Sequence, residues 1–274
     1  MPSLNKLFVV IDPTTDRQNA LLNAEWIASQ DSSISLHVYE AIFSVSDNND
    51  EEALERVETK RHRDWLEQLV EPIRAAGNDV TVEVEWNGQW RDAIAPAAAR
   101  SDADLIIKTA TTHSGTGRRM LKTSDWILLR NAHCPVYLIK KDSIQIDTKI
   151  LVALDIKRDD ELHNQLNEKV IEFGKSLAKT TSGCSLHAVN AYASSDSFVY
   201  PDDVANKIGI ASQEAHTIEG MPEEVIPEIA GAIDAGILVI GTAARDGIKA
   251  AVIGNTVEKI LDAVDSNVMT VNAA

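Results

Sequence analysis

The feature that most constrains this chain is a pattern of strand-like and helix-like segments that occurs twice. In each half, five short runs rich in Val, Ile and Leu alternate with longer segments of helical periodicity. Runs such as LFVVI and LII are apolar at every position, which is typical of strands covered by helices on both faces of a parallel sheet. The alternation therefore predicts an α/β fold in which each half forms one doubly wound sheet.

The expected elements can be placed by residue number. Strands are expected at 7–12, 35–43, 80–86, 104–110 and 134–141, and again at 149–155, 185–192, 215–220, 236–242 and 267–271. Helices are expected near 17–29, 51–76, 90–100 and 124–131, and near 160–179, 202–213, 222–234 and 256–265. Right-handed crossovers between five parallel strands favour the strand order 3-2-1-4-5 in each sheet.

The two halves also align with each other residue by residue. Asp12 corresponds to Asp155, and the sequence Ser-Leu-His recurs at 35–37 and 185–187. From Gly88 onward a constant shift of 132 residues runs without a gap through the last strand. The second copy gains 7 residues around its first helix and loses 18 around its second. Such a register indicates tandem duplication.

Composition and charge bound the domains and the classes of partner. The short polar segment 140–145 separates two expected domains, 1–142 and 147–274. No run approaches the roughly 18 apolar residues of a membrane span, so no membrane insertion is expected. The net charge of −16 disfavours nucleic acid as a partner. A beginning without a leader-like segment and two cysteines without CxxC spacing predict a cytoplasmic protein with reduced thiols.

Topology predicts where a ligand would bind. Strands 1 and 4 are neighbours in the expected order, and their connections leave in opposite directions, so a crevice opens at their carboxyl ends. In the second half, strand 1 ends at Asp155 and strand 4 at Gly241, and a loop leads to a helix beginning near Asn255. Glycines before a helix N-terminus favour phosphate binding. By spacing alone, an ordinary turn followed by a helix cap explains this stretch better than a phosphate site does.

The stretch after Gly241 resembles the nucleotide-binding signature of the universal stress protein family, G-x2-G-x9-G-[ST]. The chain has Ala244 in place of the second glycine, and Gly254 is followed by Asn255-Thr256. The segments LHAVNA and GMPEEVIPEIAGAIDAGILVIGT also match that family. The resemblance covers essentially all 274 residues as two tandem family domains.

The resemblance implies an adenine-nucleotide alpha-hydrolase-like fold with a site for ATP, accompanied by Mg²⁺, in the second half. The implied nucleotide-binding residues are Asp155, Ala188, Ile240, Gly241, Ala244, Arg245, Gly254, Asn255 and Thr256. Because one of the three glycines is replaced, we expect ATP binding to be weakened. The resemblance further implies pairing of the two domains through their last strands as an internal pseudo-dimer, and a homodimer is left open.

The first half departs from the signature at every glycine. Thr109, Thr112 and Lys122 stand at the three positions. Side chains there prevent close approach of the backbone to a phosphate, and a β-branched threonine resists positive φ. The sequence therefore predicts a degenerate nucleotide site in the first half.

Three classes of function remain open. The preferred one is a stress-response protein that binds a nucleotide rather than catalysing a reaction. A slow ATPase is the second, although the sequence assigns no catalytic residue and no clear Mg²⁺ ligand beyond Asp155. The third is a binder of an apolar or lipid-like ligand near the helix at 51–76 and its tryptophans. Histidine spacing predicts no metal site, and the recurrence of His37 at His187 predicts a packing or hydrogen-bonding role.

Overall fold

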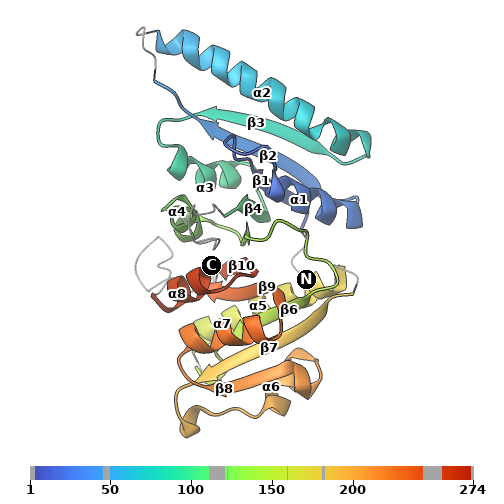
Figure 1. Cartoon of the computed structure of the whole chain (residues 1–274), viewed down its shortest axis with the longest axis vertical. Helices are drawn as coiled ribbons and strands as arrows, with labels where there is room; N and C mark the ends of the chain where they lie inside the picture. Colours follow the sequence, from blue (N-terminus) through green and yellow to red (C-terminus); the bar gives the residue numbers. More distant parts are fainter. Residues whose placement is uncertain are drawn as a thin grey trace. The chain divides into compact units, whose positions relative to one another are not determined.

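A computed structural model of the chain describes residues 4–45, 50–110, 121, 123–158, 160–180, 183–242 and 255–272. The chain divides into two compact units, one made of Ser3–Thr109 with Thr123–Ile139 and the other mainly of Lys140–Ala274. In both units, parallel strands alternate with helices (Figure 1). The predicted α/β fold class is confirmed.

The first unit is a five-stranded sheet with helical connections. Its elements are β1 (Lys6–Val10), α1 (Asn19–Gln30), β2 (Ser35–Ile42), α2 (Glu51–Ala75), β3 (Val80–Trp86), α3 (Trp90–Arg100), β4 (Leu105–Thr109), α4 (Thr123–Asn131) and β5 (Val136–Ile139). Neighbouring strands are parallel and lie in the order β3-β2-β1-β4-β5. The expected order 3-2-1-4-5 is confirmed for this unit.

The second unit repeats that arrangement. Its elements are β6 (Lys149–Leu154), α5 (Glu161–Thr180), β7 (Ser185–Tyr192), α6 (Pro201–Ile208), β8 (Ala215–Glu219), α7 (Pro222–Ala232), β9 (Ala235–Thr242), α8 (Asn255–Ala263) and β10 (Asn267–Asn272). Its parallel strands lie in the order β8-β7-β6-β9-β10. Counted within the unit, this is again 3-2-1-4-5.

The strand registers carry the same offsets as the sequence repeat. Leu7 of β1 pairs with Leu105 of β4, and their counterparts Ile150 and Ile237 pair in β6 and β9. The central strands are buried on both faces, as their unbroken apolar character predicts. The duplication read from the sequence is therefore present in the pairing of the strands.

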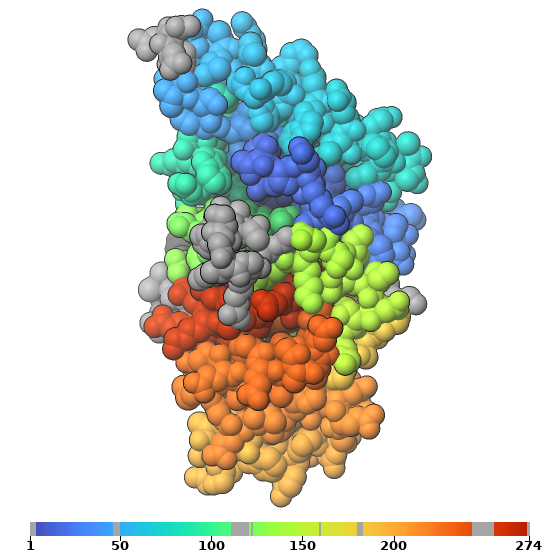
Figure 2. All heavy atoms as spheres, viewed as in Figure 1, coloured from blue at the N-terminus to red at the C-terminus, as the bar shows by residue number. Residues whose placement is uncertain are grey.

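The units differ most in the helix that follows the second strand. α2 has 25 residues and runs along β3 (Figure 1), whereas α6 has 8. α2 buries only Leu66, Val70 and Ile73, so much of its length faces solvent (Figure 2). α6 is shorter than the expected 202–213 because Gly209 adopts φ 79°, the left-handed conformation that ends helices.

Candidate functional site

In the second unit, two buried amide side chains fix the backbone at the end of β6. Asn167 on α5 accepts a hydrogen bond from the Asp155 N–H (3.2 Å) and donates one from Nδ2 to the Asp155 carbonyl (2.9 Å). Asn190 on β7 accepts from the Ile156 N–H (3.1 Å). The Asp155 side chain is exposed, and its carboxylate has no hydrogen-bond or ionic partner within the described ranges. A rigid strand end thus presents a free carboxylate.

Gly241, near the end of β9, is in close contact with Leu166. A Cβ at Gly241 would lie 2.6 Å from Leu166 Cδ2, so no larger residue fits without a shift. Leu166 is buried and lies near the start of α5, one residue before Asn167. The glycine is therefore required for helix packing independently of any ligand.

The remaining predicted nucleotide-binding residues fall into three groups. Ala188 on β7 and Ile240 on β9 are buried, with exposed fractions of 0% and 5%. Asn255 is exposed and Thr256 half-buried at the start of α8. Ala244, Arg245 and Gly254 lie outside the described residues. The structure therefore brings Asp155 and Gly241 to neighbouring strands, β6 and β9, at their carboxyl ends.

The corresponding strand end of the first unit is bonded to its own side chains. The Asp12 carboxylate accepts hydrogen bonds from the Thr14 N–H (2.9 Å) and hydroxyl (2.6 Å). Gln18 accepts from the Asp12 N–H (3.1 Å) and donates to its carbonyl (2.7 Å), as Asn167 does for Asp155. Thr109, the counterpart of Gly241, accepts a hydrogen bond from the N–H of Ala20 on α1. This strand end is fastened to α1.

A buried ion pair lies at the start of α4. The Lys108 ammonium on β4 is 2.5 Å from the carboxylate of Asp125, whose side chain is fully buried in the first turn of α4. A carboxylate there meets the positive end of the helix dipole, as a bound anion would. Ile240 and Val257 stand at the corresponding positions of the second unit, so this pair has no counterpart there.

A second buried carboxylate lies on β2. Glu40 is fully buried, and its Oε1 lies 2.8 Å from Nδ1 of His62 on α2. Burial raises the pKa of Glu40, and the charge of His62 opposes that shift. Asn190 is the counterpart of Glu40 in the second unit. Pro13 occupies the position of Ile156, and a proline has no backbone N–H to donate. The amide contact of the second unit therefore cannot form in the first.

The histidines that recur in the repeat have different partners. His37 contacts Thr81 Oγ1 (2.9 Å) and Glu83 Oε2 (2.8 Å), which is the hydrogen-bonding role expected for it. His187 stacks on His216, with ring centroids 5.8 Å apart and an interplanar angle of 10°. One ring nitrogen of each stacked histidine is buried without a hydrogen-bond partner in the part of the chain that is described. Burial lowers the pKa of both.

Several residues that shape the two crevices were not singled out by the sequence. They are Asn167, Asn190, Leu166, Lys108 and Asp125. Lys108 interrupts the apolar run of β4, and that interruption is the one signal that could have identified it. Asn190 lies in β7, which also holds Ser185 and His187, so its strand gives no such signal. Among the described residues no helix is both long and apolar enough to span a membrane. Nor do the described ranges hold three or more His, Cys, Asp or Glu side chains arranged to hold a metal.

Comparison with known proteins gives matches over nearly the whole chain. The model of the universal stress protein family matches residues 4–140 and 202–272. Universal stress protein E of Escherichia coli strain K12 is 28% identical over 96% of this chain and 92% of its own. The homologue from Photorhabdus laumondii is 27% identical over 99% of this chain and 96% of its own.

Solved structures extend the match to the fold. A crystal structure described as a universal stress protein from Pseudomonas aeruginosa UCBPP-PA14 superposes with a TM-score of 0.82 at 27% identity, covering 99% of this chain and 94% of that one. A universal stress protein from Archaeoglobus fulgidus DSM 4304 gives a TM-score of 0.77 at 16% identity, covering 99% and 100% of the two chains. The second likeness shows the fold alone.

Proposed function

Because this chain belongs to the universal stress protein family, we propose that it serves the stress response by binding a small ligand rather than by catalysis. The ligand proposed for the second unit is an adenine nucleotide, bound at the carboxyl ends of β6 and β9. The first unit is proposed to be a structural partner with a degenerate site. Pairing through the last strands, a further homodimer and a cytoplasmic location stay predictions from the sequence.

The observation that carries this proposal is the difference between the two strand-end aspartates. The Asp12 carboxylate is bonded to Thr14, whereas the Asp155 carboxylate has no partner among the residues described. A free carboxylate on a fixed backbone can accept hydrogen bonds from the hydroxyl groups of a ribose. The start of α8 at Asn255 provides backbone N–H groups and a helix dipole suited to phosphate.

The packing of α5 explains why the affinity should be weak. Leu166 is 7% exposed and lies against Gly241, and Ala188 is fully buried. A nucleotide reaching these residues has to displace Leu166, which costs about 1.5–3 kcal/mol of lost burial. At about 1.4 kcal/mol per decade, that lowers the affinity by about 10- to 100-fold.

Binding rather than catalysis is supported by the neighbours of Asp155. The side chains that bracket it, those of Asn167 and Asn190, are amides, which do not exchange protons near neutral pH. Catalysis of phosphoryl transfer requires a positioned attacking water and cations on the phosphates. None of the described side chains that contact Asp155 supplies either. We therefore assign no catalytic residue and no Mg²⁺ ligand.

Calorimetric titration of the full chain with Mg-ATP tests the proposal. We expect saturable binding that falls about tenfold or more in Asp155→Asn, since a hydrogen bond to a charged group contributes about 1.5–3 kcal/mol. The matched variant Asp12→Asn should bind as the natural chain does. Equal loss in the two variants, or no heat at millimolar nucleotide, would contradict the nucleotide site. Phosphate release above that of Asp155→Asn would contradict a role in binding alone.

A further inference from the structure

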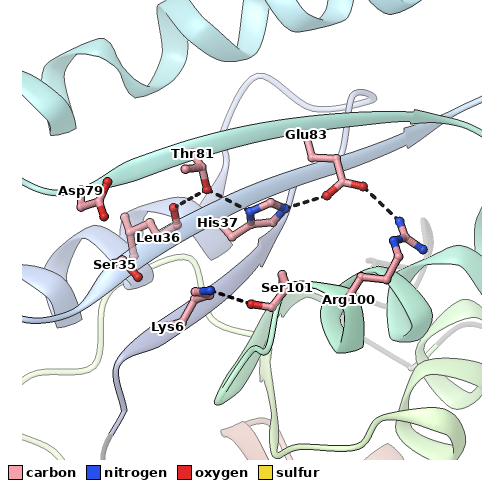
Figure 3. A pocket seen from close by; sticks show the side chains of 9 residues that line it. All are labelled: Lys6, Ser35, Leu36, His37, Asp79, Thr81, Glu83, Arg100 and Ser101. Carbon is pink, nitrogen blue, oxygen red and sulfur yellow. Dashed lines mark hydrogen bonds and ion pairs between the residues drawn. The ribbon is translucent and has the colours of Figure 1, made fainter.

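A cavity of about 370 Å³ opens in the first unit at the opposite end of the strands from Asp12 (Figure 3). Lys6 and Ser35 begin β1 and β2, and Asp79 directly precedes β3, so the cavity lies at the amino ends of the strands. The end of α3 closes one side with Arg100 and Ser101. The volume falls within the range of small-ligand sites.

One wall of this cavity is held by a chain of hydrogen bonds. His37 contacts Thr81 through Nδ1 and Glu83 through Nε2, and Arg100 donates to the other oxygen of Glu83 at 3.1 Å. Figure 3 shows the imidazole between Thr81 and Glu83, with Arg100 reaching Glu83 from α3. The ring of Phe8 stacks on His37, with centroids 5.3 Å apart. These contacts engage both oxygens of Glu83 and leave a preformed wall.

Two charged groups of the lining are left for a ligand. The Lys6 ammonium donates to the Ser101 carbonyl at 2.7 Å, and within the described ranges it forms no ion pair. An ammonium group has three N–H donors, so Lys6 retains capacity for an anion. The Asp79 side chain is exposed, and its carboxylate has no partner among the side chains described. Figure 3 shows Asp79 and Arg100 on opposite sides of the cavity.

The balance of charge selects the chemical class of the ligand. The lining holds two cationic side chains, Lys6 and Arg100, and two carboxylates, Asp79 and Glu83, so it is close to neutral. Arg100 is further paired with Glu85, just outside the lining, at 2.7 Å. α3 ends beside the cavity, and a helix C-terminus carries partial negative charge. A phosphate dianion would therefore be repelled by two carboxylates and by the helix end. A net-neutral ligand with one carboxylate and one ammonium group matches both unpaired charges.

We propose that this cavity binds a zwitterionic amino acid, whose carboxylate contacts Lys6 and whose ammonium group contacts Asp79. The repeat offers a natural comparison. Lys149 and His187 occupy the positions of Lys6 and His37 in the second unit, but Ala232 replaces Arg100. Lys6, Ser35, Leu36 and His37 thus recur in the second unit, whereas Arg100 does not, so the charge balance belongs to the first unit. The site is independent of the nucleotide proposal.

The test is a calorimetric titration of the full chain with α- and ω-amino acids in the millimolar range. Acetate, methylammonium and inorganic phosphate are the single-charge probes. We expect saturable binding of at least one amino acid, weakened about tenfold or more by Lys6→Met and by Asp79→Asn. Lys149→Met, the matched change in the second unit, should leave that binding unchanged. Circular dichroism and urea midpoints check that each variant is folded, and Lys6→Gln serves if Lys6→Met is not.

Three results would overturn the proposal. The first is absence of saturable binding for every amino acid tested. The second is acetate or phosphate binding as tightly as the amino acids, which would make the site one for simple anions. The third is equal loss of binding in Lys149→Met and Lys6→Met. Because the Mg-ATP titration depends on Asp155 and this one on Lys6, failure of either leaves the other interpretable.

Discussion

The carboxyl ends of the strands share one construction in the two units and differ in the side chains that contact them. In both, an amide side chain, Gln18 or Asn167, brackets the aspartate at the end of the first strand. In the first unit the aspartate, the end of β4 and the start of α4 are all engaged by the unit's own polar side chains. In the second unit the aspartate carboxylate has no partner among the described residues, and an apolar side chain, Leu166, covers the glycine of β9.

This difference between the units shows two ways in which the positive end of a helix can be matched by a negative charge. A helix N-terminus at the end of a crevice favours a negative charge, which either a bound anion or the chain's own carboxylate can provide. Asp125 provides it in the first unit, and Lys108 neutralises it. The second unit has no such pair at the corresponding positions, Ile240 and Val257. The two copies therefore differ in how the aspartate at the end of the first strand is engaged: Asp12 is bonded to Thr14, and Asp155 has no side-chain partner among the described residues.

The largest expected effect comes from breaking the Lys108–Asp125 pair. Asp125→Ala leaves the Lys108 ammonium buried without its carboxylate, and losses of this kind cost about 3–5 kcal/mol. We expect the free energy of unfolding of the first unit to fall by that amount in urea titrations. Val257→Ala, the matched change in the second unit, should cost about 1–2 kcal/mol, as for loss of a partly buried aliphatic side chain.

A double variant sharpens this test. Lys108→Ile with Asp125→Val copies the second unit into the first and removes both charges together. Replacing a buried ion pair by apolar side chains of similar size is often neutral or stabilising. Recovery of most of the lost stability in the double variant is expected. A single variant Asp125→Ala as stable as the natural chain would show that the pair is not a structural feature of the first unit.

The next effect concerns the glycine that distinguishes the second crevice. In Gly241→Ala the new Cβ lies too close to Leu166, and overpacking of this kind costs about 1–3 kcal/mol. Adding Leu166→Ala should reduce that penalty, so the double-mutant cycle should give a coupling of about 0.5 kcal/mol or more. Gly231→Ala on α7, where a Cβ would meet nothing within 4 Å, is the control and should not destabilise.

The smallest expected effect is a pH dependence confined to the second unit. Burial lowers the pKa of His187 and His216, so the unfolded chain binds protons below about pH 6.5 that the folded chain does not. Stability present above that pH is therefore lost as the pH falls below it. Urea midpoints measured at pH values on either side of about 6.5 should differ less in His216→Gln than in the natural chain. An unchanged pH dependence in that variant would rule out this origin.

Much of the fold could be predicted because each strand carries its own signal. The runs around Leu7 and Leu105 are apolar on both faces, and the repeat fixes which strands correspond. The length of α6 could not, because the left-handed conformation of Gly209 depends on its surroundings. Asp155 was predicted from topology as a crevice residue, and its role in binding stays a prediction.

The details of the crevices were not predictable for a physical reason. Asn167 contacts Asp155 across a separation of 12 residues, whereas Gln18 contacts Asp12 across 6, so no spacing rule identifies the contact. Lys108 interrupts an apolar strand, but no local pattern pairs it with Asp125, 17 residues further along the chain. Leu166 is one apolar residue among many in an amphipathic helix. Side-chain partners of this kind follow from the packing rather than from local patterns.

Hydrogen–deuterium exchange of the full chain, with and without saturating Mg-ATP, tests most directly whether the two crevices differ. If the second crevice binds the nucleotide, protection should rise in the segments around Asp155 and at the start of α8, while those around Asp12 and α4 stay unchanged. Protection at Asp12 and α4 with none at Asp155 would contradict the account. It would show that the nucleotide binds to the first unit and not to the second.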